Sequence, residues 1–567
     1  MKKKLKIIIP AVLGVLVGAA LSIYFFTDLF KSPKTLFYKY VGKAFKSENN
    51  YTYDTFLDEF KFYNDKACEN NAELTIDAKL SDTDEDALEA INNLKINMVS
   101  KHSPKQEEGY VNTNISYKED TLTSIELLNS NNNYGAKCSD IYKDYFYFEN
   151  KNLKELAEKL GISPEGIPDS ISKINLYELL YVSKDTRKSI SDRYFKAIDS
   201  SLDKDNFTAD KNTEITVNGK DIKADGYTLS MDSEDFYDVL LSVFETLKDD
   251  DEALDLLVEK VKILSANTDS VEISKDNLKT AVDELITSLE EAKDSNSSAS
   301  GEIEITVYES KGKTVKIEIA LGGEIIGLDI TKNKKDGIIS LYIEADNEVA
   351  VCVKNEYTID DDTTTGKITF TVSDKDCMFI DYTYLKSKSK ISLDAKLYLS
   401  DSLDTSNIDF PDISKDFSII VKYEITGDNL DKKPTKFDTN AYIKFVLDEN
   451  TDYVQLNLKS STQYSDSVEI PSLDDSNGVC LNTVTDTELE TIKTEVNTNL
   501  NTFIDKILTK LDLTRSEAGI SENSTDLLEK IKEVSPSTND SNTTSVPNYT
   551  SLKQTINNMP SEAPLSL

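Results

Sequence analysis

EIEITVYESKGKTVKIEIALGGEIIGLDIT, residues 302–331, decides the fold of this 567-residue chain. Within the strands that it predicts, apolar side chains recur at every second position, as at Ile303, Ile305 and Val307, and most positions between them carry charged or hydroxyl side chains. A period of two is typical of a strand with one buried face. The stretch therefore predicts strands over 302–308 and 314–319, paired across Ser310-Lys311-Gly312-Lys313, and a third strand over 325–331.

The same alternation extends far along the chain in both directions. Towards the C-terminus it predicts strands over 338–344, 349–354, 367–372, 378–384, 391–399, 417–425, 440–447 and 453–459. Towards the N-terminus it predicts strands over 74–80, 95–101, 109–117, 122–128, 141–148, 213–217 and 226–231. Many short alternating strands joined by turns indicate antiparallel sheet.

Helical spacing of apolar residues appears in blocks between the strands. It predicts helices over 152–160, 176–182, 184–200, 254–264 and 276–293, and one that Ser233 caps. A closing helix begins at the capping box of Thr485 and Glu488, and its apolar stripe is Leu489, Ile492, Val496, Leu500, Phe503, Ile507 and Leu511. The fold class is α+β: a large, curved, half-barrel-like antiparallel sheet with helices packed on one face, which the closing helix is expected to cover.

The first residues predict a membrane anchor. Residues 1–6 carry four lysines, and Ile7–Phe26 is apolar without a charge and long enough to cross a bilayer as a helix. The alternative is a cleaved signal peptide with Gly18-Ala19-Ala20 as its site, but the apolar run continues beyond these residues. We expect a single span with the lysine head inside and the C-terminal domain extracytoplasmic.

Small residues recur at Gly14, Gly18 and Ser22 within this span. Such spacing lets two helices approach closely, so it predicts a homodimer contact. The alternative is that small residues are simply common in segments of this kind.

Composition excludes several classes of function. There are 102 acidic and 64 basic residues, a formal charge of −38, so we expect no nucleic-acid partner. The five cysteines are far apart and odd in number, which argues against a disulfide framework. His102 is the only histidine and flanks a strand end, which leaves little room for histidine catalysis or a two-histidine metal site.

No motif for catalytic, cofactor or metal chemistry is present in the sequence. Asp82, Asp84 and Asp86 fit the start of a calcium loop, but Ala87 stands where that loop needs glycine. The densest aromatic cluster is Tyr142, Tyr145, Phe146, Tyr147 and Phe148. On a strand these rings point to both faces, which indicates either two covered faces or one binding surface.

Several local motifs resemble an uncharacterised family of single-span membrane proteins from Gram-positive bacteria related to clostridia. The motifs are Tyr134-Gly135, Tyr145, Glu149-Asn150, Asn152-Leu153-Lys154, Leu160-Gly161-Ile162, Ile167-Pro168-Asp169, Asn218-Gly219-Lys220, Tyr227-Thr228-Leu229 and the lysine-rich head with residues 34–40. The resemblance covers roughly residues 1–265 and implies no known activity or site. The order of strands and helices is more loosely similar to half-barrel lipoprotein carriers, in which a curved sheet holds acyl chains.

These patterns divide the chain into six parts. They are a cytoplasmic head (1–6), an anchor (7–26), a juxtamembrane helical stalk (27–70), a strand-plus-helix half (71–300), a meander with the closing helix (301–512) and a mostly disordered tail (513–567). The favoured hypothesis is a non-enzymatic binding or scaffolding protein of the cell envelope that holds a lipid, another apolar ligand or an envelope peptide. The alternative is a cell-envelope hydrolase that uses carboxylates.

Overall fold

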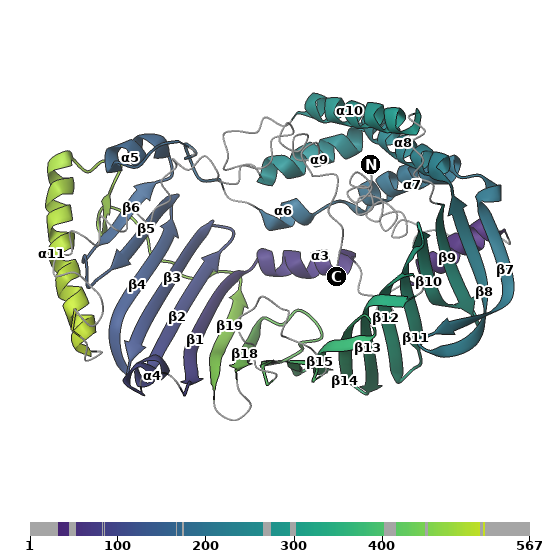
Figure 1. The fold of residues 1–567 in the computed structure, drawn as a ribbon. Helices are drawn as coiled ribbons and strands as arrows, with labels where there is room; N and C mark the ends of the chain where they lie inside the picture. The colour runs from purple at the N-terminus through teal and green to yellow at the C-terminus, as the bar shows by residue number, and fades with distance from the viewer. Residues whose placement is uncertain are drawn as a thin grey trace.

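A computed structural model describes residues 32–44, 53–81, 83, 85–165, 167–172, 175–264, 274–294, 302–346, 348–401, 416–447, 452–510 and 514–515. Within these residues twenty strands form one sheet (Figure 1). From edge to edge the order is β7 to β19, then β1 to β6, and finally β20. Each neighbouring pair is antiparallel except β20, which runs parallel to β6.

The N-terminal strands are β1 (Ala67–Lys79), β2 (Leu94–Ser103), β3 (Glu108–Tyr117), β4 (Asp120–Ser130), β5 (Asn133–Cys138), β6 (Tyr145–Glu149), β7 (Phe207–Val217) and β8 (Lys220–Met231). The C-terminal strands are β9 (Ile303–Ser310), β10 (Lys313–Leu321), β11 (Glu324–Lys332), β12 (Asp336–Ala345), β13 (Glu348–Asp360), β14 (Thr363–Val372), β15 (Lys375–Lys386), β16 (Lys390–Leu399), β17 (Ser418–Gly427), β18 (Lys436–Val446), β19 (Tyr453–Ser465) and β20 (Gly478–Cys480).

The described helices are α2 (Pro33–Ala44), α3 (Tyr53–Asn64), α4 (Glu85–Asn92), α5 (Leu153–Leu160), α6 (Leu176–Leu180), α7 (Lys184–Ser201), α8 (Ser233–Asp249), α9 (Asp251–Leu264), α10 (Lys275–Asp294) and α11 (Asp486–Lys510), with a 3₁₀ turn at Lys204–Asn206. None of them is both long and apolar enough to cross a membrane. The anchor expected over residues 7–26 lies outside the described residues, as do Gly14, Gly18 and Ser22.

Two long-range pairings make the sheet continuous. β1 pairs with β19 along its whole length, from Ala67 opposite Ser465 to Lys79 opposite Tyr453. β8 pairs with β9, so the sheet runs through the division expected at residue 300. Figure 1 shows the result as a trough, with β1–β6 in one wall, β7–β12 in the other and β15–β19 between them.

Helices close one end of this trough. The amphipathic helix α2 contacts β7, β8, β9 and β10, which places it inside the curl of the sheet. Phe37, Tyr40 and Val41 of α2 join a buried cluster whose other members are Ile198, Leu202, Phe207, Tyr227, Leu229, Met231, Val239, Val243, Ile305, Val307 and Ile317. This cluster is the largest hydrophobic core of the described residues, and the expected stalk helix is part of it.

Polar contacts anchor α2 in that position. Lys34 Nζ donates to the carbonyl oxygens of Asp199 (2.7 Å) and Leu202 (3.0 Å) at the C-terminal end of α7. The buried Thr314 hydroxyl of β10 donates to the carbonyl oxygen of Tyr40 at 2.6 Å. Each contact satisfies carbonyl groups near the end of a helix.

The closing helix forms as α11 but lies elsewhere than expected. Its capping box is present, with Thr485 N donating to Glu488 Oε2 at 2.8 Å and Glu488 N donating to Thr485 Oγ1 at 3.3 Å. Asn499 Nδ2 donates to the Ile141 carbonyl oxygen, and Lys506 pairs with Asp140. Figure 1 shows α11 at the outer edge beside β4–β6, so it leaves the meander of β9–β19 uncovered.

Two local expectations need correction. The N-cap of α8 is Asp232, which accepts a hydrogen bond from Asp235 N, and Ser233 is the first helical residue. The strand expected over residues 141–148 starts only at Tyr145, and the strand before it, β5, was not expected. β5 contains Gly135 against Leu473 and Tyr147, and this short run shows too little alternation to reveal a strand.

Candidate functional site

The candidate site is the inner face of the sheet, defined by the strand register. Residues directly opposite each other in an antiparallel pair point to the same side. One row starts in the buried core at Val307 and continues through Ile317, Leu328, Leu341, Val353, Phe370 and Met378. A second row runs Tyr384, Leu393, Tyr423, Ala441, Leu458, Leu74, Ile96 and Ile115. The face that packs on α2 at the closed end therefore carries an apolar residue on every strand from β9 through β19 and on to β3.

Part of this face is exposed to solvent. Leu341 is 52 % exposed and Leu127 is 51 % exposed. Every large apolar side chain that is exposed within the described strands belongs to the inner face; these are Ile125, Leu127, Leu341, Ile343, Val351, Val372, Tyr384, Tyr423, Ile443, Leu456 and Leu458. An exposed apolar surface confined to one face makes that face a candidate binding surface.

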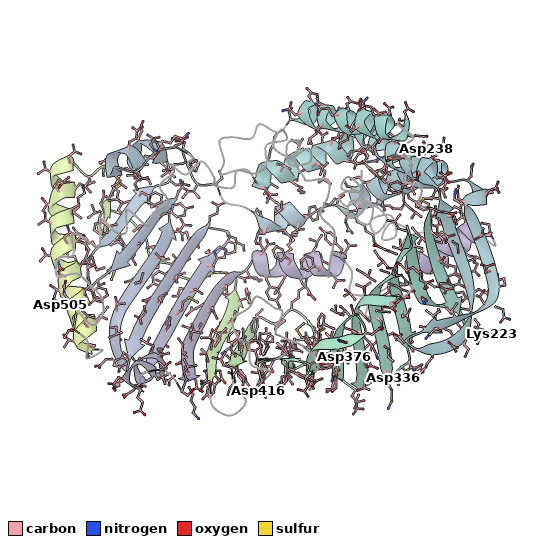
Figure 2. All side chains as sticks on the ribbon, viewed as in Figure 1. Lys223, Asp238, Asp336, Asp376, Asp416 and Asp505 are labelled. Atoms are coloured by element: carbon pink, nitrogen blue, oxygen red, sulfur yellow. The ribbon has the colours of Figure 1, made fainter. Side chains whose placement is uncertain are left out.

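Charge is partitioned between the two faces. From β16 through β19 and on to β3, the paired inner positions of the described strands carry no Asp, Glu, Lys or Arg. The outer positions carry ion pairs, such as Lys422 with Asp394 at 3.0 Å and Lys390 with Glu424 at 2.6 Å. Figure 2 places the labelled charged residues Lys223, Asp238, Asp336 and Asp505 at the periphery of the molecule. The charged side chains of these strands therefore lie on the outer face.

Helix α3 bridges the trough. The ring of Tyr63 lies 4.8 Å from that of Tyr464 on β19, and Lys433 Nζ donates to the Asp58 carbonyl oxygen. At its other end Tyr53 donates to the carbonyl oxygen of Leu180 in α6. Figure 1 shows α3 and α6 spanning the space between the two walls. Their exposed apolar side chains are Tyr53, Phe56, Leu176 and Leu180.

A cavity of about 740 Å³ opens on the inner face at β2–β6. Its apolar lining includes Val111, Leu127, Ala136, Phe146 and Phe148. Volumes of this order are typical of small-ligand sites.

The aromatic cluster of β6 serves both faces of the sheet. Tyr145 and Tyr147 point outward into a buried cluster with Leu128, Leu473 and Cys480. Phe146 and Phe148 point the other way and line the cavity. Both interpretations of the cluster are thus partly right, because alternation sends neighbouring rings to opposite faces.

A buried polar cluster lies beneath the tip of the β7–β8 hairpin. β7 bends at a bulge between Asp210 and Thr213, and Asn218 N at the tip donates to Asp329 Oδ2 at 2.6 Å. Lys316 Nζ lies 2.8 Å from Glu318 Oε1 and 3.9 Å from Asp329 Oδ1. Lys316, Glu318 and Asp329 did not stand out in the sequence, because a strand pattern does not show which hairpin folds over which charge.

Burial governs the protonation of this cluster. It raises the pKa of Asp329, and the hydrogen bond from Asn218 N–H only partly opposes the shift. Burial also acts to lower the pKa of Lys316, but the hydrogen bond and charge of Glu318 outweigh it and the net pKa is raised. Burial raises the pKa of Tyr342 to about 12. The hairpin covers the cluster, so it offers no open groove in which two carboxylates could act on a polymer.

The residues singled out in the sequence do not converge on a catalytic site. His102 lies exposed at the end of β2, at the rim of the cavity. All five cysteines have free thiols. Among the described residues no three His, Cys, Asp or Glu side chains are grouped as metal ligands, and Asp82 and Asp84 lie outside those residues.

Comparison with protein families identifies the chain. A model described as "Family of unknown function (DUF6583)" matches residues 1–504. The chain belongs to this family. A comparison with curated proteins finds no match.

Solved structures give only weak likenesses. A mutant porin of Rh. blastica is 6 % identical with a TM-score of 0.18, covering 70 % of this chain and 98 % of that one. Transferrin Binding Protein B from Haemophilus parasuis Hp5 is 9 % identical with a TM-score of 0.12, covering 70 % and 76 %. The CymD monoaromatic hydrocarbon channel is 8 % identical with a TM-score of 0.16, covering 74 % and 94 %. Likenesses this weak define neither the fold family nor the activity.

Proposed function

We propose that this protein is a non-enzymatic lipid-binding protein of the cell envelope that holds acyl chains against the inner face of its sheet. The observation that carries the proposal is the confinement of the exposed apolar strand residues to that one face. Burying them against an acyl chain is favourable by about 25 cal/mol for each Å² removed from water.

The backbone favours an acyl chain over a peptide. The inner face belongs to interior strands, whose N–H and C=O groups are already paired with their neighbours. A peptide laid on this surface would bury its own backbone groups without partners, at a cost of about 1–3 kcal/mol each. An acyl chain has no such groups, so it suits an uncharged apolar trough better than an envelope peptide does.

The apolar segment Ile7–Phe26 complements this function. In our proposal it is a single-span anchor with the domain outside the cytoplasm, and it holds the trough close to a source of lipid. Contacts through Gly14, Gly18 and Ser22 would bring two copies together. The half-barrel-like architecture then serves as a holder or scaffold rather than as an enzyme.

The carboxylate-dependent hydrolase is the alternative function. Its best support is the raised pKa of the buried Asp329, since perturbed carboxyl groups mark many active sites. Asp329 is nevertheless packed against Asn218 and Lys316 under a hairpin, away from the open inner face. The lipid-binding proposal is therefore favoured.

A direct test is to measure retained lipid. The full chain is purified in lipid nanodiscs with a photoreactive acyl lipid, irradiated and digested, and cross-linked peptides are identified by mass spectrometry. We expect cross-links on inner-face peptides that contain Leu127, Leu341 or Leu458. The variant Leu458→Asp should lose the cross-link at its own position, because it places a charge in the trough.

The matched control is Asn457→Asp, which puts the same side chain on the outer face of β19 next to Leu458. It should leave the cross-links unchanged. Cross-links confined to residues 1–31, or spread equally over both faces, would contradict the proposal.

A further inference from the structure

A groove of about 580 Å³ lies on the outer face of the sheet, opposite the trough, and its lining is polar. The strand register resolves this lining into two rows of five outward side chains on the adjacent strands β17, β18, β19, β1 and β2. The rows are Glu424, Asn440, Lys459, Glu73 and Asn97, and Thr426, Asp438, Ser461, Asn71 and Val99. The groove therefore crosses five strands, over about 19 Å at the usual spacing between strands.

Asparagine is concentrated on this part of the outer face. Six outward positions on β18, β19, β1, β2 and β3 hold it, namely Asn440, Asn457, Asn71, Asn97, Asn112 and Asn114. The outward positions of the described strands β9–β17 hold none. Asparagine is generally depleted in strands, so strand formation does not account for this concentration. A departure from local propensity that is confined to one groove indicates a role for the amide groups.

The amides in the groove are free to contact a ligand. Among the described residues no hydrogen bond involves the side-chain amides of Asn71, Asn97 or Asn440. Asn71 and Asn440 are exposed, and Asn97 is half-buried. Each amide offers two N–H donors and an acceptor oxygen, which match hydroxyl groups that both donate and accept. The groove therefore suits a ligand that carries many hydroxyl groups along its length.

The charges of the groove balance. The carboxylates of Glu424 and Glu73 each lie beside a lysine ammonium outside the lining, at O···N distances of 2.6 Å and 3.1 Å. The other charged lining residues are Asp438 and Lys459, one of each sign. Such a lining gives no net attraction to a polyanion or a polycation. A peptide would also need apolar pockets for its side chains, and Val99 is the only apolar member of the two rows.

We infer that the outer groove binds an extended, neutral glycan. The glycan crosses the strands, and its hydroxyl groups exchange hydrogen bonds with the amides of Asn71, Asn97 and Asn440. The Asp438 carboxylate accepts a further, charge-assisted hydrogen bond. The inference goes beyond the proposed function and does not depend on it, because the sheet itself separates the groove from the trough.

The test is isothermal titration calorimetry of the full chain in nanodiscs, with empty nanodiscs as the blank. The probes are cellotetraose and chitotetraose, which are extended neutral tetrasaccharides, and the peptides tetralysine and tetraglutamate. We expect saturable binding of at least one tetrasaccharide and of neither peptide.

Asn97→Leu removes an amide from the groove, and Asn114→Leu is its matched control. Asn114 lies directly opposite Asn97 on the same face and is also half-buried, but it belongs to β3, beyond the groove. Loss of one hydrogen bond should weaken tetrasaccharide binding about fivefold in Asn97→Leu, and Asn114→Leu should bind like the parent chain. Melting curves in the same nanodiscs identify a variant that unfolds. If Asn97→Leu does so, Asn440→Leu, at an exposed position, replaces it with the same expected weakening.

The outcomes separate this inference from the proposed function. Failure of both tetrasaccharides to bind would overturn it, as would unchanged binding in a folded Asn97→Leu or Asn440→Leu. If tetralysine binds instead and Asn97→Leu weakens that binding, the groove is a site for basic peptides and the glycan assignment is wrong. None of these results concerns the inner face, where the acyl-lipid cross-links test the proposed function separately.

Discussion

The closed and open ends of the sheet share one sequence pattern and have different surroundings. At the closed end, β7–β10 and the helices α2, α7 and α8 bury the inner face so completely that Val307 is 0 % exposed. On β19 the equivalent inward residue Leu458 is 38 % exposed. An inward apolar residue therefore contributes to the core in one region and is free to contact a ligand in the other.

The largest expected loss of stability comes from placing a carboxylate on the inner face of the sheet. The effect is compared between the closed end and the open end. Val307→Asp buries an unpaired carboxylate and should destabilise the closed end by more than about 4 kcal/mol. Leu458→Asp keeps its charge in water and should cost less than about 1 kcal/mol. Thermal unfolding of the two full-length variants in the same nanodiscs measures the difference. Equal losses would mean that the open face is a core as well.

The next effect concerns the ion pair that joins the helices of the closed end. Arg193 Nη2 lies 2.8 Å from Asp250 Oδ1, and the Asp250 side chain is only 3 % exposed. Arg193→Met leaves that carboxylate buried and unpaired, so the free energy of unfolding should fall by about 3–5 kcal/mol. The control Lys493→Met breaks the exposed pair with Glu490 on α11 and should cost at most about 0.5 kcal/mol. Urea denaturation compares them, and similar midpoints would contradict the difference.

Ligand binding should stabilise mainly the open region. At a free concentration of acyl lipid equal to 100 Kd, linkage gives about 2.7 kcal/mol of stabilisation. We expect slower hydrogen exchange in β16–β19 and β1–β4, where the inner face is open, and little change in β8–β10, which the helices already cover. Mass-spectrometric exchange of the full chain with and without added acyl lipid tests this. Protection centred on β8–β10 would place the ligand elsewhere.

The smallest effect is the pH dependence of Asp329. Its pKa is raised, so between the ordinary value of about 3.9 and the raised value the folded chain holds a proton that the unfolded chain has released. The stability contribution of this group is therefore lost as pH rises through that window. Asp329→Asn should gain stability relative to the parent chain as pH increases from about 4 towards neutrality.

Urea midpoints at each pH compare Asp329→Asn with the control Asp394→Asn. Asp394 pairs with Lys422 on the exposed outer face, and losing this pair should cost at most about 1 kcal/mol. If the difference in urea midpoint between the parent chain and Asp329→Asn stays constant with pH, burial does not govern the protonation of this carboxyl group.

The parts of the fold that can be predicted from the sequence are those that depend on residues close together in the chain. Alternation along the meander follows from the geometry of one strand, so β9–β19 and their inward residues are predictable. The capping box of Thr485 and Glu488 is predictable because it depends only on two residues three positions apart at the start of one helix. β5 is not, because its few residues show too little alternation and its Gly135 packs against Leu473 from far along the chain.

The sequence by itself determined that the chain forms a large antiparallel sheet with one apolar face, and that its charges lie on the other. These properties depend on spacings of two residues. Only the tertiary structure decided that β1 pairs with β19, that α2 fills one end, and that α11 leaves the rest open. An apolar stripe lowers its free energy against any complementary surface, so the choice between a core and a binding trough depends on which distant helices reach it.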